Sequence, residues 1–374
     1  MAITGAFDTD GGIAAVNRLV IQAILDEGYK IDIFAFTEKD KEISQKYTDP
    51  SKINYKVYSG NKLFFIASVW QALLNNKYDF VFSDHVNVSC ILLPFSKVGF
   101  CHYIVWLHGI EVFPPKPDIK GKLGLQSAWK RLASSDYTQK RVTERFPGLQ
   151  VTACDLALDP FHYPQSLPPT PTQTVLPIEM ECIGGAKHLI GTRLILHVGR
   201  MSTKERYKGQ ESLLQAFPLL HKQFPDVQLL LAGRGDDLPR IRSLADPFPE
   251  ELRNAIFIPG YVDDAMLEQL YRTCYLFAMP SQGEGFGLVY LEAMAHAKPC
   301  VGNRFDAASS VIRDRVTGVL VDDPKSTEQV AAAISWLISH PEESHRMGMV
   351  GYDLVRSQYL FRHFRKRFWK AISY

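Results

Sequence analysis

Short, strongly apolar runs alternate with segments of helical periodicity along this chain, and no other sequence feature constrains its fold as much. In the first half, apolar runs lie at 31–36, 80–82 and 103–107, and helical patterns lie at 13–27, 63–75 and 137–146. Apolar runs of this length are typical of strands that are buried on both faces. The alternation therefore predicts a doubly wound parallel sheet with helices on both faces.

The same alternation starts again in the second half. Strands are expected at 193–198, 227–232, 255–259, 275–279 and 317–321, and helices at about 209–223, 264–272, 287–297 and 327–339. A proline-rich stretch at 161–191 separates the two series, and proline cannot continue a helix or a central strand. We predict an N-terminal domain at 1–187, a C-terminal domain at 188–355 and a C-terminal helix at 356–374. Ligands bind at the carboxyl ends of such strands, so two facing domains would place a site between them.

Composition excludes several classes of protein. The 374 residues suffice for two domains, and the formal net charge of +2 removes the electrostatic case for a general nucleic-acid binder. The 6 cysteines are scattered without a CxxC pair, which favours reduced thiols and no metal site. No apolar run is long enough to span a membrane, and the N-terminus does not resemble a secretion signal. We therefore expect a cytoplasmic protein.

The loops that could carry chemistry follow the expected strands of the second domain. Arg200 follows the first strand and Lys208 opens the next helix, so both could supply cations to a phosphate. The glycine-rich run 281–287 precedes another helix, where close backbone approach and free N–H groups suit an anion. Glu284 lies in that run, and Glu292 lies in the helix, within reach of a ribose diol. Each feature alone is weak, but together they favour a sugar nucleotide.

These residues resemble the EX7E motif of retaining family-4 glycosyltransferases with the GT-B fold, because seven residues separate Glu284 from Glu292. Further matches are Gly199-Arg200 with Lys208-Gly209, Gly260-Tyr261-Val262, Thr317–Val321, Gly11-Gly12-Ile13, Trp106–Glu111 and, more weakly, Asp84–Asn87. The resemblance covers nearly the whole chain. It implies two Rossmann-like domains facing a central cleft, with the C-terminal helix crossing back to the first domain.

The resemblance also implies residue roles. Arg200 and Lys208 would bind the donor diphosphate, Glu292 the ribose, and Glu284 and His108 the donor sugar. The implied catalytic set is His108, Arg200, Lys208 and Glu284. The implied donor-binding set is Gly12, Arg200, Lys208, Arg234, Tyr261, Val262, Glu284, Gly285, Phe286, Gly287, Leu288 and Glu292. Neither a metal nor another cofactor is implied, and the leaving phosphate would deprotonate the acceptor hydroxyl in a front-face reaction.

Three segments depart from the family pattern. Asp8-Thr9-Asp10 has the form of a metal-binding DxD, but it stands beside the GlyGly loop and is interpreted as a polar turn. The segment 302–310 lacks the usual Gly-Gly-x-x-Glu/Asp form, which leaves the choice of sugar open. The segment 153–160 stands where many relatives have a Pro-Asn-Gly-Val-Asp turn, so the hinge is expected to differ.

Basic residues gather in two places despite the near-neutral total. Eight basic residues lie between 112 and 148, and six more lie in the run 356–374, whose aromatic residues share one broad helical face. The aromatic face is expected to be buried on the first domain. The cations at 116–145 and 356–370 could contact an anionic membrane or a lipid-diphosphate acceptor.

The predicted function is transfer of a hexose, with retention, from UDP-glucose to a saccharide or polyprenyl-diphosphate-linked acceptor in exopolysaccharide or glycolipid biosynthesis. A GDP-mannose-dependent mannosyltransferase is the first alternative, because contacts to one hydroxyl decide the sugar. A GT-B sugar-nucleotide epimerase and a non-catalytic sugar-nucleotide-binding protein are further alternatives. The expected location is cytoplasmic, or peripheral on the cytoplasmic face of the membrane.

Overall fold

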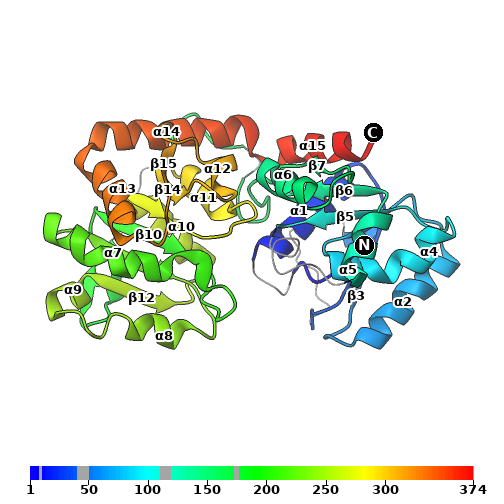
Figure 1. Cartoon of the computed structure of the whole chain (residues 1–374), viewed down its shortest axis with the longest axis horizontal. Coiled ribbons are helices and arrows are strands. Elements are labelled where there is room, and N and C mark those ends of the chain that lie inside the picture. The colour runs from blue at the N-terminus through cyan, green and yellow to red at the C-terminus, as the bar shows by residue number, and fades with distance from the viewer. Residues whose placement is uncertain (8–10, 40–49, 110–118, 165, 172–176, 374) are drawn as a thin grey trace. The chain divides into compact units, whose positions relative to one another are not determined.

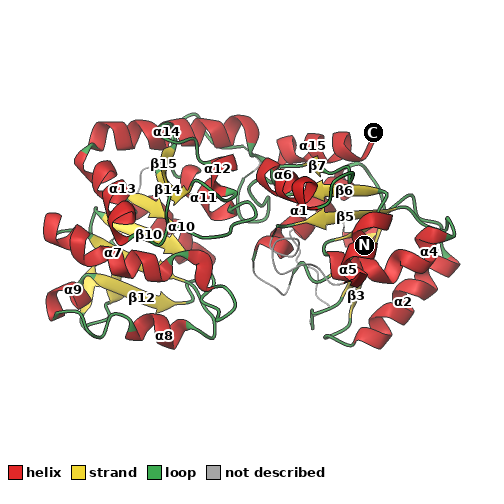
Figure 2. Ribbon diagram, viewed as in Figure 1, coloured by secondary structure: helices red, strands yellow, loops and turns green. Residues whose placement is uncertain are grey.

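The computed structural model of the chain describes residues 1–7, 11–39, 50–109, 119–164, 166–171 and 177–373 (Figure 1). It contains two compact units: residues 1–165 together with 359–374, and residues 166–358. Each unit is built on its own parallel sheet with helices packed against it (Figure 2). The doubly wound α/β class predicted from the alternating pattern is confirmed for both units.

The boundary between the units lies earlier than the predicted 187/188, at 165/166. Strands β8 (Glu179–Glu181) and β9 (Lys187–Leu189) form an antiparallel hairpin in the second unit. The Ile183 N–H donates to the Ile256 carbonyl at 2.8 Å. The Tyr352 hydroxyl donates to the Pro168 carbonyl at 2.8 Å. Proline excludes helices and central strands in much of this stretch but allows a short hairpin and packing against the second unit, which explains the error.

The first unit holds a seven-stranded sheet in the order β3-β2-β1-β4-β5-β6-β7, with every pairing parallel. The strands are β1 (Ala2–Ile3), β2 (Ile31–Ala35), β3 (Ile53–Val57), β4 (Val81–Ser83), β5 (Tyr103–Leu107), β6 (Lys130–Ala133) and β7 (Thr152–Ala153). The helices are α1 (Gly12–Asp26), α2 (Lys62–Asn75), α3 (Val86–Ser89), α4 (Leu93–Lys97), α5 (Ile119–Ser127) and α6 (Asp136–Arg145). Outward from β1, this is the Rossmann strand order.

Helices cover both faces of this sheet. Val105 of β5 packs in one core with Phe65 and Val69 of α2. The next residue, Trp106, points to the opposite face, where its ring centroid lies 6.0 Å from that of Phe364. Alternation of side chains along a strand produces these two cores.

The last helix, α15 (Phe361–Ser373), packs on the first unit, so the predicted return of the C-terminal helix is confirmed. Its Trp369 indole donates to the Ala23 carbonyl of α1 at 3.2 Å. Phe364 and Phe368 are fully buried, as expected for the aromatic face. The helix begins at Phe361 rather than 356, because α14 (Pro341–Gln358) continues through that position.

The second unit holds a six-stranded parallel sheet in the order β12-β11-β10-β13-β14-β15. The strands are β10 (Leu194–Val198), β11 (Gln228–Ala232), β12 (Ile256–Gly260), β13 (Leu276–Ala278), β14 (Cys300–Asn303) and β15 (Gly318–Val321). The helices are α7 (Gln210–Gln223), α8 (Leu238–Ser243), α9 (Glu250–Asn254), α10 (Asp264–Thr273), α11 (Leu288–Met294), α12 (Ala308–Val311) and α13 (Thr327–Ser339). The sequence missed β14, whose Gly-Asn ending reads as a turn.

Candidate functional site

The strand order of the second unit reverses between β10 and β13. At such a switch point, the loops after the two central strands leave in opposite directions and open a crevice at the carboxyl edge of the sheet. The loop after β10 carries Arg200 and Lys208, and the loop after β13 carries Glu284. The topology therefore brings together the loops that the sequence analysis singled out.

Lys208 and Glu284 form an ion pair across this point. The Lys208 Nζ lies 2.8 Å from Glu284 Oε1, and their side chains are only 16% and 10% exposed. Burial disfavours the charged ammonium, but Glu284, Tyr207 and Glu205 together outweigh it, so the pKa of Lys208 lies above its usual value. The buried His197 ring nitrogen Nε2 lies 2.9 Å from the Lys208 carbonyl oxygen and fixes the backbone behind the pair.

The two loops touch each other closely at Gly209. This residue has a φ of 88°, and a Cβ built on it would lie 2.7 Å from the Pro280 carbonyl oxygen. Only glycine fits there, because both the backbone conformation and the space exclude a side chain. The Gln282 N–H also donates to the Tyr207 carbonyl at 2.8 Å. This contact fixes the spacing of Lys208 and Glu284.

Arg200 lies at the exposed side of the same loop. Its side chain is 54% exposed, and its guanidinium pairs with Glu205 at 2.6 Å. The Gln210 side chain donates to the Arg200 carbonyl at 3.1 Å. A partly exposed guanidinium with two planar donor edges can bind a phosphate while keeping one carboxylate contact.

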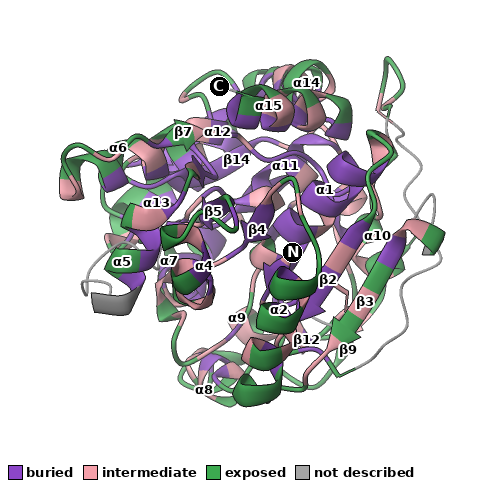
Figure 3. Ribbon diagram, turned by 90° about the vertical axis from the view of Figure 1, so that its right-hand side faces the viewer, coloured by how far each residue is buried: buried purple, intermediate pink, exposed green. Residues whose placement is uncertain are grey.

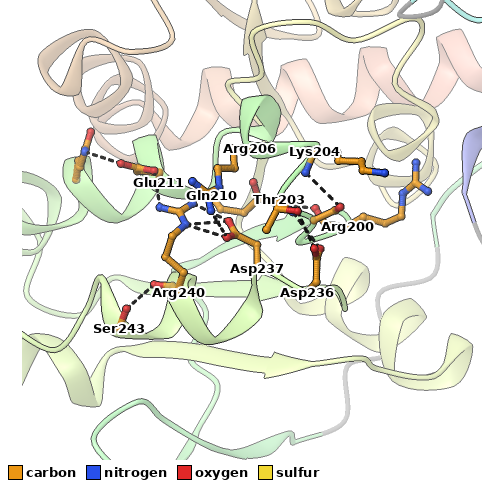
Figure 4. Close-up of polar contacts among 12 residues, drawn as sticks. Arg200, Thr203, Lys204, Arg206, Gln210, Glu211, Asp236, Asp237, Arg240 and Ser243 are labelled. Carbon is orange, nitrogen blue, oxygen red and sulfur yellow. Dashed lines mark hydrogen bonds and ion pairs between the residues drawn. The ribbon is translucent and has the colours of Figure 1, made fainter.

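A network of hydrogen bonds and ion pairs joins the loop 200–206 to the residues that follow β11 (Figure 4). The buried Asp237 carboxylate accepts from Arg240 at 2.7 Å and from Arg206 at 2.9 Å. Asp236 accepts from the Thr203 backbone at 3.0 Å and from its hydroxyl at 2.7 Å. These aspartates follow β11, so the network anchors the loop after β10 to the neighbouring strand.

Glu292 lies on α11, as predicted. The Tyr271 hydroxyl of α10 donates to Glu292 Oε2 at 2.8 Å. The Tyr271 ring stacks on His296 with centroids 5.6 Å apart. Gly287 precedes the helix with a φ of 87°, a conformation that glycine adopts without strain. The carboxylate is thus oriented by neighbours rather than loosely solvated.

The remaining predicted residues of this unit lie at two places. Arg234, after β11, has its guanidinium 5.1 Å from the centroid of the exposed Tyr261 ring, after β12. Val262 follows Tyr261 and is half-buried. Gly285, Phe286 and Gly287 lie in the loop before α11, and Leu288 is the first residue of that helix. The Phe286 side chain is buried. The Arg234–Tyr261 pair offers a flat surface of the kind that stacks on a base.

His108 and Gly12 belong to the first unit. The His108 ring nitrogen Nε2 lies 2.8 Å from the Asp84 carbonyl oxygen, and burial lowers the pKa of His108 to about 3, so the imidazole is neutral. Gly12 begins α1, and a Cβ built there meets nothing within 4 Å. Asp84 is itself buried and accepts from Asn17 at 2.8 Å and from Thr4.

The DxD segment Asp8–Asp10 lies outside the described residues, as do Ile110 and Glu111 of the first-domain motif. In the described part of the chain, no group of three or more His, Cys, Asp and Glu side chains could hold a metal ion. All 6 cysteines are unpaired, as predicted. None of the helices described is long and apolar enough to cross a membrane.

Several residues that shape this site were not predicted from the sequence. Asp306 and Tyr271 contact the predicted residues Glu284 and Glu292, and Asp237 binds Arg206 of the loop that carries Arg200 and Lys208. Asp306 lies in the segment 302–310 that departs from the family pattern, which was the only signal for it in the sequence. Asp237 and Tyr271 carry no such signal, since each is an ordinary helix-start or helix residue.

Comparison with known proteins gives an independent view. Residues 192–340 match the model of the family "Glycosyl transferases group 1". A phosphatidyl-myo-inositol mannosyltransferase of Mycobacterium leprae is 35% identical over 184 residues, which cover 48% of this chain and 47% of that protein. An alpha-D-kanosaminyltransferase of Streptomyces kanamyceticus is 28% identical over 166 residues, covering 44% of this chain and 42% of that protein. The chain thus spans about half the length of the curated relatives it matches.

Two solved structures match over nearly the whole chain. Anabaena HepE in complex with UDP and glucose has a TM-score of 0.75 at 18% identity, covering 100% of this chain and 99% of that one. Sucrose-phosphate synthase from Thermosynechococcus elongatus has a TM-score of 0.74 at 18% identity, covering 100% and 95%. Identity this low establishes the fold alone.

The two Rossmann-type sheets and the similarity to these solved structures show the GT-B fold. The resemblance drawn from the sequence is confirmed at this level. Within that fold, residues 192–340 are similar to group 1 glycosyl transferases, and the matched relatives are named as transferases of mannose or kanosamine.

Proposed function

We propose that the protein is a retaining hexosyltransferase that uses a nucleoside-diphosphate sugar and acts on a saccharide or lipid-linked acceptor in exopolysaccharide or glycolipid biosynthesis. One observation carries the proposal: the buried Lys208–Glu284 pair lies at the switch point of the sheet, with Arg200 on the same loop. Two cations on the loop after β10 and the Glu284 carboxylate on the loop after β13 suit a ligand with a diphosphate at one end and hydroxyl groups at the other.

The proposed chemistry needs no metal, because the protein's own cations can stabilise the leaving group. Arg200 and Lys208 bind the diphosphate and offset the charge that develops as the bond from the anomeric carbon to the phosphate oxygen breaks. The acceptor hydroxyl oxygen forms the new bond on the same face, and its proton passes to the departing phosphate. Glu284 binds the sugar hydroxyls, and Glu292 binds the ribose hydroxyls.

The donor is proposed as UDP-glucose or GDP-mannose. UDP-glucose was the first expectation from the sequence. The names of the relatives favour mannose: besides the Mycobacterium leprae protein, a GDP-mannose-dependent phosphatidylinositol monomannoside mannosyltransferase of Mycolicibacterium smegmatis is 30% identical over 151 residues. The Arg234–Tyr261 pair can border either base.

Donor hydrolysis in the absence of acceptor tests the proposal. The purified protein is incubated with UDP-glucose, UDP-galactose, UDP-N-acetylglucosamine and GDP-mannose, and the released nucleoside diphosphate and free sugar are quantified. One donor should be hydrolysed slowly to the sugar with its anomeric configuration retained. Lys208→Ala should abolish this release, whereas Lys204→Ala, which removes an exposed lysine from the same loop, should not.

The other outcomes have definite meanings. Binding of a sugar nucleotide without any release would indicate a non-catalytic binding protein. Release of an epimerised sugar would indicate an epimerase. Neither binding nor release of any of the four donors would contradict the proposal.

We also propose peripheral contact with an anionic membrane through the basic residues at 116–145 and 356–370 together with an apolar surface beside the first of these segments. The structure assigns some of these cations to internal contacts: Arg131 donates to the Leu125 carbonyl at 2.6 Å, and Arg367 donates to the Asp155 carbonyl at 2.9 Å. Lys122, Lys140, Lys366 and Lys370 are exposed.

The apolar surface supports membrane contact. It consists of exposed side chains of α2 and of the turn after α4, namely Leu63, Phe64, Trp70, Leu74, Val98 and Phe100. Much of the α2 ribbon is accordingly coloured as exposed in Figure 3. Phe64 is 69% exposed and Leu63 is 80% exposed, although both lie on a helix whose other face is buried. Exposed lysines at 62, 77 and 97 adjoin these residues, a combination that suits anionic lipid.

Vesicle flotation tests the membrane proposal. The protein should bind vesicles that contain phosphatidylglycerol and bind neutral vesicles less. Phe64→Ser should weaken the binding, whereas Leu219→Ser, at a 47% exposed leucine of α7 in the second unit, should leave it unchanged. Equal flotation of both variants and the parent protein would contradict a role for the apolar surface.

A further inference from the structure

The carboxyl group of Asp306 lies inside the site, next to the loop of Glu284. Asp306 stands between β14 and α12 and is only 1% exposed. It belongs to the segment 302–310, where this chain departs from the Gly-Gly-x-x-Glu/Asp pattern. The proposed donor chemistry gives Asp306 no role, so its burial needs another explanation.

Three donors converge on this carboxylate. The Ser281 hydroxyl donates to Asp306 Oδ2 at 2.9 Å, and the Glu284 N–H donates to the same oxygen at 3.0 Å. The Ala308 N–H donates to Oδ1 at 2.8 Å. Both oxygens are therefore used by the protein itself, and Asp306 is not placed to receive a ligand.

The backbone of Glu284 is clamped from both sides. Its N–H is held by Asp306, and its carbonyl accepts from the Ala307 N–H at 3.2 Å. The Gly283–Gly285 turn has glycine on either side of Glu284, so its own sequence does little to fix its conformation. The segment 306–307 consequently fixes the backbone of Glu284, and with it the position from which the Glu284 side chain extends.

The cluster also has an electrostatic consequence. Burial, followed by repulsion from the Glu284 carboxylate, raises the pKa of Asp306 to about 7. The largely buried Glu284 carboxylate thus interacts with the Lys208 ammonium and with a second buried carboxyl group, that of Asp306. Such an arrangement is costly unless the hydrogen bonds to each group are satisfied, and for Asp306 the three donors satisfy them.

We propose that Asp306 is a positioning residue that fixes the Glu284 turn, and through it the Lys208–Glu284 pair, in the geometry that receives the donor sugar. The proposal rests on the proposed function. Asp306 acts through Glu284 and touches neither the sugar nor the phosphates. Its loss should therefore affect recognition of the sugar and leave recognition of the nucleoside diphosphate nearly intact.

Calorimetric binding tests this separation. Asp306→Asn keeps the size of the side chain, but its amide NH₂ must face at least one of the three donors, so the clamp is weakened. The affinity for the donor identified by hydrolysis should fall at least tenfold, whereas the affinity for the matching nucleoside diphosphate should change less than twofold. Asp322→Asn, which removes an exposed carboxylate paired with Arg304 on the same unit, should change neither affinity.

Two further variants keep the proposal falsifiable. Ser281→Ala removes one donor without changing charge, and it should produce a smaller loss in the same direction if Asp306→Asn does not fold. In a Glu284→Gln background, Asp306→Asn should cause less than a twofold further loss of donor affinity, because the two residues act as one unit.

The results that would overturn the inference differ from those that would overturn the function. Equal losses of donor and nucleoside diphosphate, unchanged donor affinity, or fully additive effects of the two substitutions would overturn the positioning role while leaving the transferase assignment in place. A parent protein that binds no sugar nucleotide and no nucleoside diphosphate would overturn both.

Discussion

Replacing Lys208 with alanine should lower both the stability of the fold and the turnover of the donor, and the two effects can be measured separately. The substitution removes an ammonium that lies 2.8 Å from Glu284 Oε1, in a pair whose side chains are 16% and 10% exposed. Breaking a fully buried pair costs about 3–5 kcal/mol, and an exposed pair contributes about 0–1 kcal/mol. This pair lies near the buried limit but keeps some solvent contact, so we expect Lys208→Ala to lower the free energy of unfolding by about 2–3 kcal/mol.

Turnover should fall further than stability alone explains. Loss of one preorganised charge at a developing anion typically lowers kcat by about 10²–10³. The double variant Lys208→Ala/Glu284→Gln removes the stranded carboxylate, so its stability should return close to that of the parent, while its donor turnover should stay low. Urea denaturation and donor hydrolysis measure the two effects on the same preparations.

Two results would refute this reasoning. A Lys208→Ala protein as stable as the parent would show that the ion pair contributes little to the folded state. A double variant with near-normal turnover would show that the Lys208 ammonium does not stabilise the leaving diphosphate. The Lys204→Ala control, in the same loop, should be indistinguishable from the parent in both assays.

Three further substitutions test other parts of the site. Burial lowers the pKa of His197 from 6.5 to about 4, so the unfolded chain takes up its proton first and His197 destabilises the fold increasingly as the pH falls from about 6.5 to 4. In His197→Gln, the free energy of unfolding should therefore fall less steeply with decreasing pH than in the parent, by about 1.4 kcal/mol per pH unit within this window. Urea denaturation at pH 7.5 and 5.5 measures the difference. The same dependence on pH in both proteins would contradict the prediction. Asp237→Ala removes the carboxylate that accepts hydrogen bonds from Arg240 and Arg206, so it should lower the free energy of unfolding by about 2 kcal/mol. It should also weaken the binding of the nucleoside diphosphate, measured by calorimetry. Unchanged binding would show that the Asp237 network does not hold the loop of Arg200 and Lys208 in place. Gly209→Ala should lower the free energy of unfolding by more than about 2 kcal/mol in the same denaturation assay and should abolish donor hydrolysis. The control is Gly185→Ala, at a glycine with a similar φ but open space around it. It should lower the free energy of unfolding by only about 1–2 kcal/mol and leave the protein active.

The alternation of apolar runs and helical patterns predicted most of the fold. Strand β5 and helix α13 have the predicted bounds, β10 and β11 begin one residue later than predicted, and β12 is shifted by one residue at both ends. Runs that are buried on both faces leave few alternatives to a central parallel strand, which explains this accuracy. The errors concern short or weakly apolar elements, such as β14, and the stretch before β10, where packing rather than composition decides which unit the chain joins.

The candidate site was predicted residue by residue but not as an arrangement. Glycine spacing and cations at strand ends indicated Arg200, Lys208 and Glu284. The ion pair between Lys208 and Glu284 joins residues 76 positions apart, and no local pattern encodes such a contact. The same is true of Asp306, which reaches Glu284 only because β13 and β14 are neighbours in the sheet.

A crystal structure of the full chain with the hydrolysed donor tests the central claim most directly. We predict that phosphate oxygens lie within about 3 Å of Lys208 Nζ and of the Arg200 guanidinium, with sugar hydroxyls at Glu284 and ribose hydroxyls at Glu292. A diphosphate bound away from the loops that follow β10 and β13 would contradict the assignment of this edge of the sheet as the donor site.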